Sequence, residues 1–164
     1  MRPQDVVILL KMLTIKEPNW QYRDLAGSLF ISISEISESL NRSLLAGLID
    51  ESRRKVHRQS LMEFIQYGLH YVFPKVPGSM ATGIPTAHSY SFYKPYFSSE
   101  QDYIWPDEDG TVRGLAIEPL YKNVVKAVKV DEDLHKLLAS IDIIRVGKTR
   151  ETKLALKELQ KMIL

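Results

Sequence analysis

The sequence contains no cysteine, and this absence excludes several kinds of site at once. Without thiols the chain has no disulfide, no thiolate nucleophile, no zinc ribbon and no iron–sulfur cluster. Histidine, another common metal ligand, is scarce, and the four histidines at positions 57, 70, 88 and 135 share no metal-ligand spacing. We therefore expect neither a metal site nor a cofactor.

Long apolar runs are also missing. No stretch approaches the roughly 20 apolar residues that a helix needs to cross a bilayer. The chain begins with Arg2 and Asp5 before a short apolar segment, and no small-residue cleavage site follows. Since 45% of the residues are apolar and 26% are charged, the composition is typical of a globular protein, which we expect to be cytoplasmic and to have no membrane partner.

The excess of positive charge, +2, is too small to indicate nucleic-acid binding by overall attraction. The charges are nevertheless unevenly placed. Residues 96–112 hold several acids and no Lys or Arg, whereas residues 52–62 hold no acid and the basic side chains Arg53, Arg54, Lys55, His57 and Arg58. Such a basic cluster is more often ordinary solvated surface than a ligand site, unless its neighbours provide a docking geometry.

Apolar residues at helical spacing dominate the first fifty positions. They predict one helix over residues 3–15, which has a proline in its first turn, and a second over residues 21–30. A third helix is expected to begin at Ser32, because Ser32-Ile33-Ser34-Glu35 is a capping box, and to end at Gly47. The join between the second and third helices is therefore very short, and a brief strand at residues 48–49 follows.

The remainder of the chain is less regular. A second capping box at residues 60–63 predicts a helix that runs to Pro74. Residues 75–110 are rich in proline, glycine and aromatic residues and are expected to be extended, and residues 111–117 form a strand that feeds a helix near Pro119. Two further helices are predicted, one capped by Asp131 and closed by Gly147, and a last one capped by Thr149.

Catalytic patterns are absent or incomplete. The stretch RVGKT at residues 145–149 resembles the end of a phosphate-binding loop, but the glycine required five positions earlier is replaced by Asp142. The acids of residues 107–109 stand beside Gly110 and are typical of a turn. No Ser-His-Asp or nucleophile-elbow signature is present. We therefore expect that the protein is not an enzyme.

Residues 20–50 carry the strongest functional pattern. Apolar side chains at positions 25, 29, 36 and 40 lock two helices together, and small Ala26 stands where the helices approach closely. The expected outward face of the second of these helices consists of Ser34, Ser37, Glu38, Asn41 and Arg42. In a helix-turn-helix, that face enters the major groove of DNA.

The segment YRDLAGSLFISISEISESLNRSLLAGLID resembles the winged helix-turn-helix of bacterial MarR-like transcription regulators over about residues 18–60. The resemblance implies that the helix at about 32–46 reads base edges and that a wing at about 50–59 contacts phosphate or the minor groove. The family usually has glycine in the turn where this chain has Phe30. We therefore expect either an altered backbone there or an uncommon dihedral angle at Phe30.

The chemistry of the predicted face suits base reading. Ser34 and Ser37 bond phosphates or base edges, Asn41 pairs with adenine, Arg42 reaches guanine or phosphate, and Glu38 accepts from cytosine. Glu35 and Glu38 repel phosphates, so the attraction is assigned to the wing. The expected DNA-binding residues are Ser34, Ser37, Glu38, Asn41, Arg42, Arg53, Arg54, Lys55 and Arg58.

The sequence thus predicts a mainly α protein of the α+β class, with a winged helix-turn-helix in residues 1–74 and an α-rich C-terminal region with a short strand pair in residues 75–164. The expected function is sequence-specific binding of double-stranded DNA by a homodimeric transcription regulator, a repressor. Leu10, Leu13, Leu156, Leu159 and Ile163 are the dimer candidates, and burial within the monomer is their other interpretation.

A second hypothesis stays open at this point. The fold would then be a protein-interaction module, antitoxin-like or an adaptor, that holds a protein partner with the aromatic segment of residues 78–105. The alternative for that segment is packing of its aromatic side chains over neighbouring helices.

Overall fold

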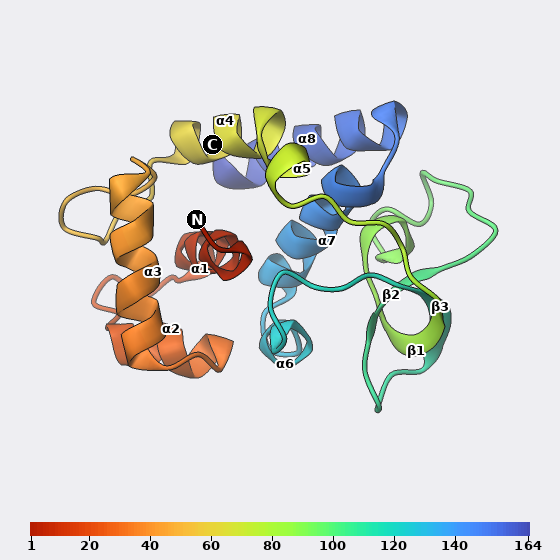
Figure 1. Cartoon of the computed structure of the whole chain (residues 1–164), viewed down its shortest axis with the longest axis horizontal. Helices are drawn as coiled ribbons and strands as arrows, with labels where there is room; N and C mark the ends of the chain where they lie inside the picture. Colours follow the sequence, from red (N-terminus) through yellow and green to blue (C-terminus); the bar gives the residue numbers. More distant parts are fainter.

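The computed structural model describes all 164 residues and shows a mixed α and β protein in which helices predominate. The helices are α1 (Pro3–Thr14), α2 (Tyr22–Leu29), α3 (Ile33–Leu45), α4 (Arg58–Tyr67), α5 (Leu69–Val72), α6 (Val124–Val128), α7 (Glu132–Val146) and α8 (Thr149–Ile163). The strands are β1 (Met80–Pro85), β2 (Tyr103–Pro106) and β3 (Val112–Ala116). Figure 1 shows α2 and α3 at one end of the molecule and the strands at the other.

Helix α1 lies at the centre of the fold, between α3 and α7 (Figure 1). Its residues from Val6 to Leu10 are all fully buried. A helix that is apolar on every side is stable only when other elements surround it. The segment predicted over residues 3–15 is thus a helix as expected, and it forms the core that both halves of the chain share.

The turn between α2 and α3 has the uncommon backbone that the sequence requires. Phe30 adopts a left-handed conformation, with φ at 56° and ψ at 41°, which confirms the second of the two expectations for this position. Ser32 caps α3 by accepting a hydrogen bond from the N–H of Glu35 at 3.2 Å. Gly47 has φ at +75° just after α3, so the predicted end of this helix is also confirmed.

The helical segment after residue 57 differs from its prediction. Helix α4 begins at Arg58 rather than at the capping box of residues 60–63, and the helix breaks at Gly68 instead of continuing to Pro74. At the break the N–H of Gly68 bonds to the carbonyl of Phe64 at 2.8 Å. The phenyl ring of Phe64 leaves little room for a larger residue there, since its nearest atom would lie 3.1 Å from a Cβ on Gly68.

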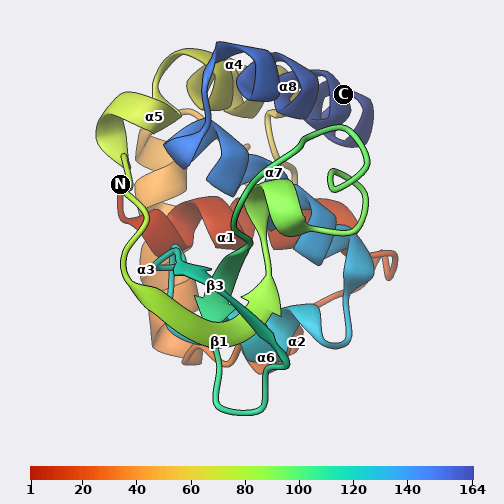
Figure 2. The ribbon, with the colours of Figure 1, turned by 90° about the vertical axis from the view of Figure 1, so that its right-hand side faces the viewer.

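The strands form a small closed barrel rather than the predicted strand pair (Figure 2). Strand β1 pairs antiparallel with both β2 and β3, and β2 and β3 pair in parallel. Gly83 stands where β1 pairs with both neighbours, opposite Pro106 and Val112. A Cβ atom on Gly83 would lie 1.8 Å from the carbonyl oxygen of Trp105, so closure of the barrel requires glycine at this position.

A buried polar cluster ties the barrel to α7. Asp142 of α7 accepts hydrogen bonds from the hydroxyl of Thr86 at 2.8 Å and from the indole N–H of Trp105 at 2.7 Å. Its other carboxylate oxygen pairs with the guanidinium of Arg145 at 2.8 Å. Arg145 also donates to the carbonyl oxygens of Phe73 and Glu118, at 3.1 and 3.0 Å. Five segments distant in the sequence therefore meet at this cluster.

The last third of the chain follows its predicted pattern with two exceptions. Asp131 caps α7 by accepting from the N–H of Leu134 at 3.0 Å, and Gly147 ends this helix, as expected. Helix α8 starts at Thr149, although Lys148 rather than Thr149 occupies the cap position. The helix expected near Pro119 is displaced, because α6 begins only at Val124.

The aromatic segment of residues 78–105 faces largely inwards. Tyr90, Tyr93 and Trp105 are buried, and the hydroxyl of Tyr93 shares a hydrogen bond of 2.5 Å with Ser140 of α7. Tyr90 bonds to Glu132 of the same helix. Tyr96 is the member of this segment that stays largely exposed. The buried aromatic side chains of the segment thus pack against α7.

One hydrophobic cluster of 39 buried residues runs through both halves of the chain. Residue 74 therefore marks no break in the core. The dimer candidates Leu10, Leu159 and Ile163 belong to this cluster and are fully buried, while Leu13 and Leu156 pack against its edge.

None of the helices has the length and apolar character needed to cross a membrane.

Candidate nucleic-acid interface

The outward face of α3 is a stripe of polar side chains. Ser34 and Glu38 are exposed, and Ser37 and Asn41 are half-buried, at successive helical turns. The buried side of the helix consists of Ile36, Ser39, Leu40 and Ser43. Figure 1 shows α3 along one end of the molecule, with its length open to that side. Four of the five helix residues that the sequence assigned to DNA therefore lie together on an accessible face.

Arg42, the fifth, does not lie on this face, and its expected outward position is wrong. Its guanidinium holds the carboxylate of Asp5, with Nε at 2.9 Å and Nη2 at 2.8 Å from the two oxygens. Asp5 is fully buried on α1 and also accepts from the hydroxyl of Ser39 at 2.7 Å. Arg42 thus fastens α3 to α1, because an unpaired carboxylate in that position would cost several kcal/mol.

The pKa of Asp5 reflects this arrangement. Burial raises the pKa of the carboxyl, but hydrogen bonds from Arg42, the N–H of Arg2 and Ser39 outweigh burial and leave the pKa below its ordinary value of 3.8. Asp5 is therefore ionised at neutral pH, when it holds α3 in place.

The loop of residues 50–57, which we call the basic loop, leaves the end of α3 as a short hairpin. Ile49 and Val56 form a β-bridge at its base. At its tip, the carboxylate of Asp50 accepts from the backbone N–H groups of Arg54 and Lys55, both at 3.1 Å. A bond from the Ser52 hydroxyl, together with these N–H bonds, holds the pKa of Asp50 below its ordinary value. Hydrogen bonds to the Asp50 carboxylate therefore hold the tip of the basic loop in place.

The basic residues of this region divide into two groups. The guanidinium of Arg54 lies 4.6 Å from the ring centroid of Trp20 and bonds to the carbonyl of the same residue. Arg58, at the start of α4, donates to the carbonyl of Ile163 at 2.8 Å. Both residues are exposed and their side chains contact other parts of the fold, so their contact with phosphate stays a prediction.

Arg53 and Lys55 form the second group. Arg53 has φ at 58°, a left-handed conformation at the tip of the hairpin, and Lys55 is exposed. Neither forms an ion pair with a carboxylate of the chain. These two cations are therefore available to a ligand, beside the end of the polar stripe of α3.

Two further cations near α3 were not recognised in the sequence. Lys122 and Lys126 are exposed and lie by the turn that precedes α3, where the Nζ atom of Lys126 is 5.7 Å from the ring centroid of Phe30. Their spacing of four residues was the available signal. It was missed because nothing in the sequence places residues 122–126 beside residue 30.

Comparison with protein-family models, curated proteins and solved structures finds no match to this chain.

No group of three or more His, Asp or Glu side chains is placed to share a metal ion. The polar cluster around Asp142 is buried, and each of its members is bonded to another part of the fold. The accessible polar groups at the α3 end of the molecule are those of the α3 stripe and of the basic loop.

Proposed function

We propose that this protein is a sequence-specific DNA-binding transcription regulator built on a winged helix-turn-helix, with α3 as the recognition helix and the basic loop as the wing. The observation that carries the proposal is the polar stripe of α3 beside two uncommitted cations, Arg53 and Lys55, at one end of the molecule. A helix of this kind fits the major groove, which is about 12 Å wide. Repression by occupation of an operator is the sign of regulation that we expect.

Base reading is assigned to the helix. Asn41 offers the donor and acceptor pair that matches adenine, and Glu38 accepts from the amino group of cytosine. Ser34 and Ser37 provide shorter contacts to base edges or phosphates. With Arg42 engaged by Asp5, guanine has no arginine partner on this face, so we expect the preferred site to be read mainly through adenine and cytosine.

Removal of the two wing cations tests the proposal. Arg53→Ala/Lys55→Ala is expected to weaken binding to all duplexes about tenfold and to reduce the slope of log K against log salt by about 2, because each cation neutralises about one phosphate. Asn41→Ala should instead relax the choice of sequence by about 1–3 kcal/mol. Fluorescence anisotropy with labelled duplexes at several salt concentrations measures both effects.

The matched control is Lys153→Ala/Lys157→Ala, which removes two exposed cations from α8. This variant should bind DNA like the wild type. Equal losses in the two double variants would show that only net charge matters, and the assignment of a wing would then be abandoned.

The second hypothesis, a protein-interaction module, is less favoured, because Tyr90, Tyr93 and Trp105 lie in the core and most other aromatic side chains of residues 78–105 are partly buried against it. A homodimer remains a prediction. The leucine and isoleucine side chains expected at its interface are largely used inside the monomer, so a dimer would need another surface.

A further inference from the structure

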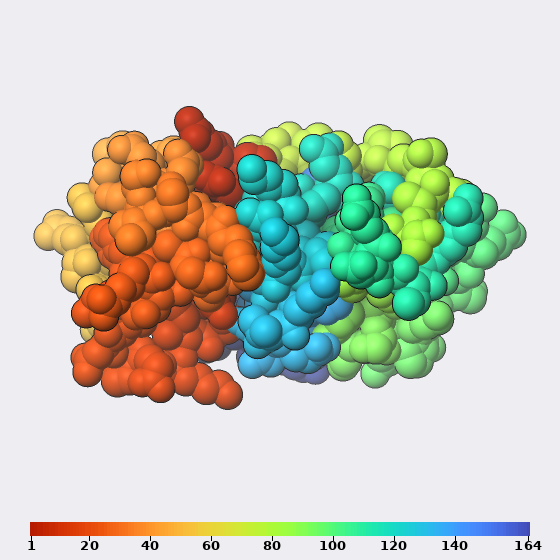
Figure 3. Space-filling model, turned by 90° about the horizontal axis from the view of Figure 1, so that it is seen from below, coloured from red at the N-terminus to blue at the C-terminus, as the bar shows by residue number.

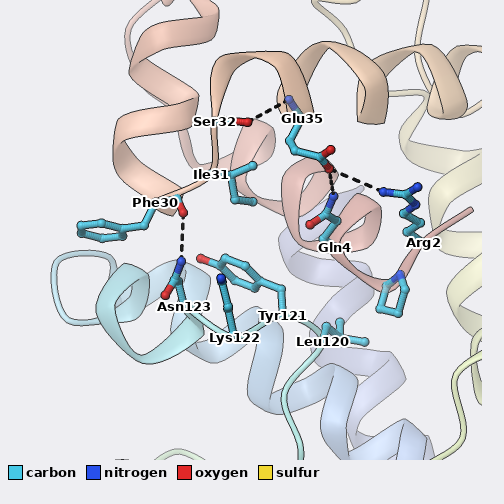
Figure 4. Close-up of a pocket in the computed structure, with 11 residues that line it drawn as sticks. Arg2, Gln4, Phe30, Ile31, Ser32, Glu35, Leu120, Tyr121, Lys122 and Asn123 are labelled. Carbon is cyan, nitrogen blue, oxygen red and sulfur yellow. Dashed lines mark hydrogen bonds and ion pairs between the residues drawn. The ribbon is translucent and has the colours of Figure 1, made fainter.

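An open groove of about 640 Å³ lies at the start of α3 (Figure 4). Its walls come from three distant parts of the chain: the start of α1, the turn between α2 and α3, and residues 120–123. The last of these segments belongs to the C-terminal half, to which the sequence assigned no part in DNA binding. Its position is fixed by the amide of Asn123, which donates to the carbonyl oxygen of Phe30 at 2.9 Å.

The groove has an excess of groups that attract an anion. Lys122 lines it, is exposed and forms no ion pair. Lys126 of α6 lies just outside the lining of the groove, with its Nζ atom 5.7 Å from the ring centroid of Phe30. The N-terminus of α3, a helix of 13 residues, also borders the groove at Ser32 and adds the positive end of the helix dipole.

The carboxylate of Glu35 opposes this attraction only weakly. It accepts from the amide of Gln4 at 2.8 Å and lies 3.7 Å from the guanidinium of Arg2. Figure 4 shows these three side chains together on the side of the groove away from Lys122 and Asn123. The charge of Glu35 is thus offset by Gln4 and Arg2. Lys122, on the other side of the groove, has no carboxylate partner.

Tyr121 provides independent evidence for a ligand. Its side chain lines the groove, only 9% of the residue is exposed, and its hydroxyl has no hydrogen-bond partner. Figure 4 shows this hydroxyl directed towards the turn before α3. Burial raises the pKa of Tyr121, so the group is a proton donor at neutral pH. A buried donor without an acceptor costs about 1–3 kcal/mol, which a bound oxygen atom would recover.

We propose that this groove binds a phosphate of the DNA backbone, with Lys122 and Lys126 supplying the charge and Tyr121 a hydrogen bond. The inference rests on the proposed function, which it extends to the C-terminal half.

Helix α3 is about 20 Å long at 1.5 Å per residue. The basic loop leaves its C-terminal end, and the groove borders its N-terminal end. Figure 3 shows the residues of α6 directly beside those of α2 and α3 on this face.

Two anchors at opposite ends of the recognition helix have a geometric consequence. The phosphates that flank the major groove run along both of its edges, about 12 Å apart. A helix placed between them is held from both sides when each end carries its own cations. The groove would therefore fix the orientation of α3 as well as add affinity.

The experiment compares Lys122→Ala/Lys126→Ala with the control Lys153→Ala/Lys157→Ala, which has the same four-residue spacing. We expect the first variant to bind duplex DNA about tenfold more weakly, with a salt slope smaller by about 2, and the control to bind like the wild type. Wild-type affinity in the first variant would overturn the inference. It would not overturn the proposed function, which the variant without Arg53 and Lys55 tests separately.

A second arm uses inorganic phosphate as the probe and does not depend on DNA. Phosphate added at constant ionic strength should shift the amide signals of Asn123, Ile33 and Ser34 in nuclear magnetic resonance spectra, and Tyr121→Phe should weaken that binding about tenfold. Absence of these shifts would overturn the groove as a phosphate site. Shifts in a wild-type protein that binds no DNA would refute the proposed function and assign the groove to a free phosphate compound instead.

Discussion

Replacement of Arg145 by methionine is expected to lower the free energy of unfolding by about 3–5 kcal/mol, the range for breaking a buried ion pair from one side. Arg145 is almost completely buried and pairs with Asp142 at 2.8 Å. Its loss leaves the charge of Asp142 without a counter-ion and removes the donor to two loop carbonyls, those of Phe73 and Glu118. Urea denaturation followed by circular dichroism measures the change.

The control for this variant is Arg113→Met, because Arg113 is exposed on β3. We expect the control to change stability by less than about 0.5 kcal/mol. The double variant Asp142→Asn/Arg145→Met should recover part of the loss, since the amide still accepts from Thr86 and Trp105 without carrying a charge. Equal stability of Arg145→Met and Arg113→Met would contradict the assigned role of the cluster.

Asp5→Ala is expected to cost about 3 kcal/mol or more, because it leaves Arg42 and Ser39 without their acceptor beside a fully buried helix. Since Asp5 connects α1 to α3, we also expect the variant to lose DNA affinity at temperatures where it is still folded. Denaturation and anisotropy measured on the same sample separate these effects.

Asp24→Ala is the matched control for Asp5→Ala. Asp24 occupies the same position in the first turn of α2 and accepts the same kind of backbone bond, from the N–H of Gln21 at 2.8 Å, but it is exposed and has no arginine partner. We expect a loss of about 1 kcal/mol from this capping bond alone. Comparable losses in the two variants would mean that the pair with Arg42 contributes nothing.

The contribution of Asp5 should also depend on pH. Because the folded pKa of Asp5 lies below the ordinary value of 3.8, its stabilising effect is fully present at neutral pH and disappears as the pH falls through the folded pKa. The difference in stability between wild type and Asp5→Ala should therefore narrow below about pH 4. A difference that stays constant down to pH 2 would argue against an ionised Asp5 in the folded protein.

The elements specified by local signals were predictable from the sequence. Periodic apolar residues gave α1, α2 and α3, and the caps at Ser32 and Asp131 were placed correctly because each depends on a side chain and an N–H three residues apart. The left-handed conformation of Phe30 was one of two expectations, and these came from the resemblance, since the family usually has glycine at this place in the turn.

Features that depend on long-range contacts were not predictable. Arg42 stands at a helix position that the pattern allows to be outward, and only the buried carboxylate of Asp5, 37 residues earlier, turns it inward. Arg54 and Arg58 likewise meet partners, Trp20 and Ile163, that their local sequence does not indicate. The sequence therefore showed neither these contacts of Arg54 and Arg58 nor the position of Lys122 and Lys126 near Phe30.

The barrel also depends on long-range contacts that the sequence did not predict. Its strands are short, and each carries glycine or proline, so no alternation of apolar and polar residues marks them as a closed sheet. The decisive constraint is steric: a Cβ on Gly114 would lie 2.5 Å from the carbonyl oxygen of Asp102. Such close approaches follow from the packing of the backbone and leave little trace in a single sequence.

The most direct test of the central claim is the salt dependence of binding by the wild-type chain to a duplex from the region upstream of its own gene, with a scrambled duplex as the control. Four cations, Arg53, Lys55, Lys122 and Lys126, are assigned to phosphates, so log K should fall against log salt with a slope of about −4 for each bound chain, and the upstream duplex should bind more tightly than the scrambled one. Binding that is absent, or that does not change with salt, would contradict the proposal that this protein recognises DNA.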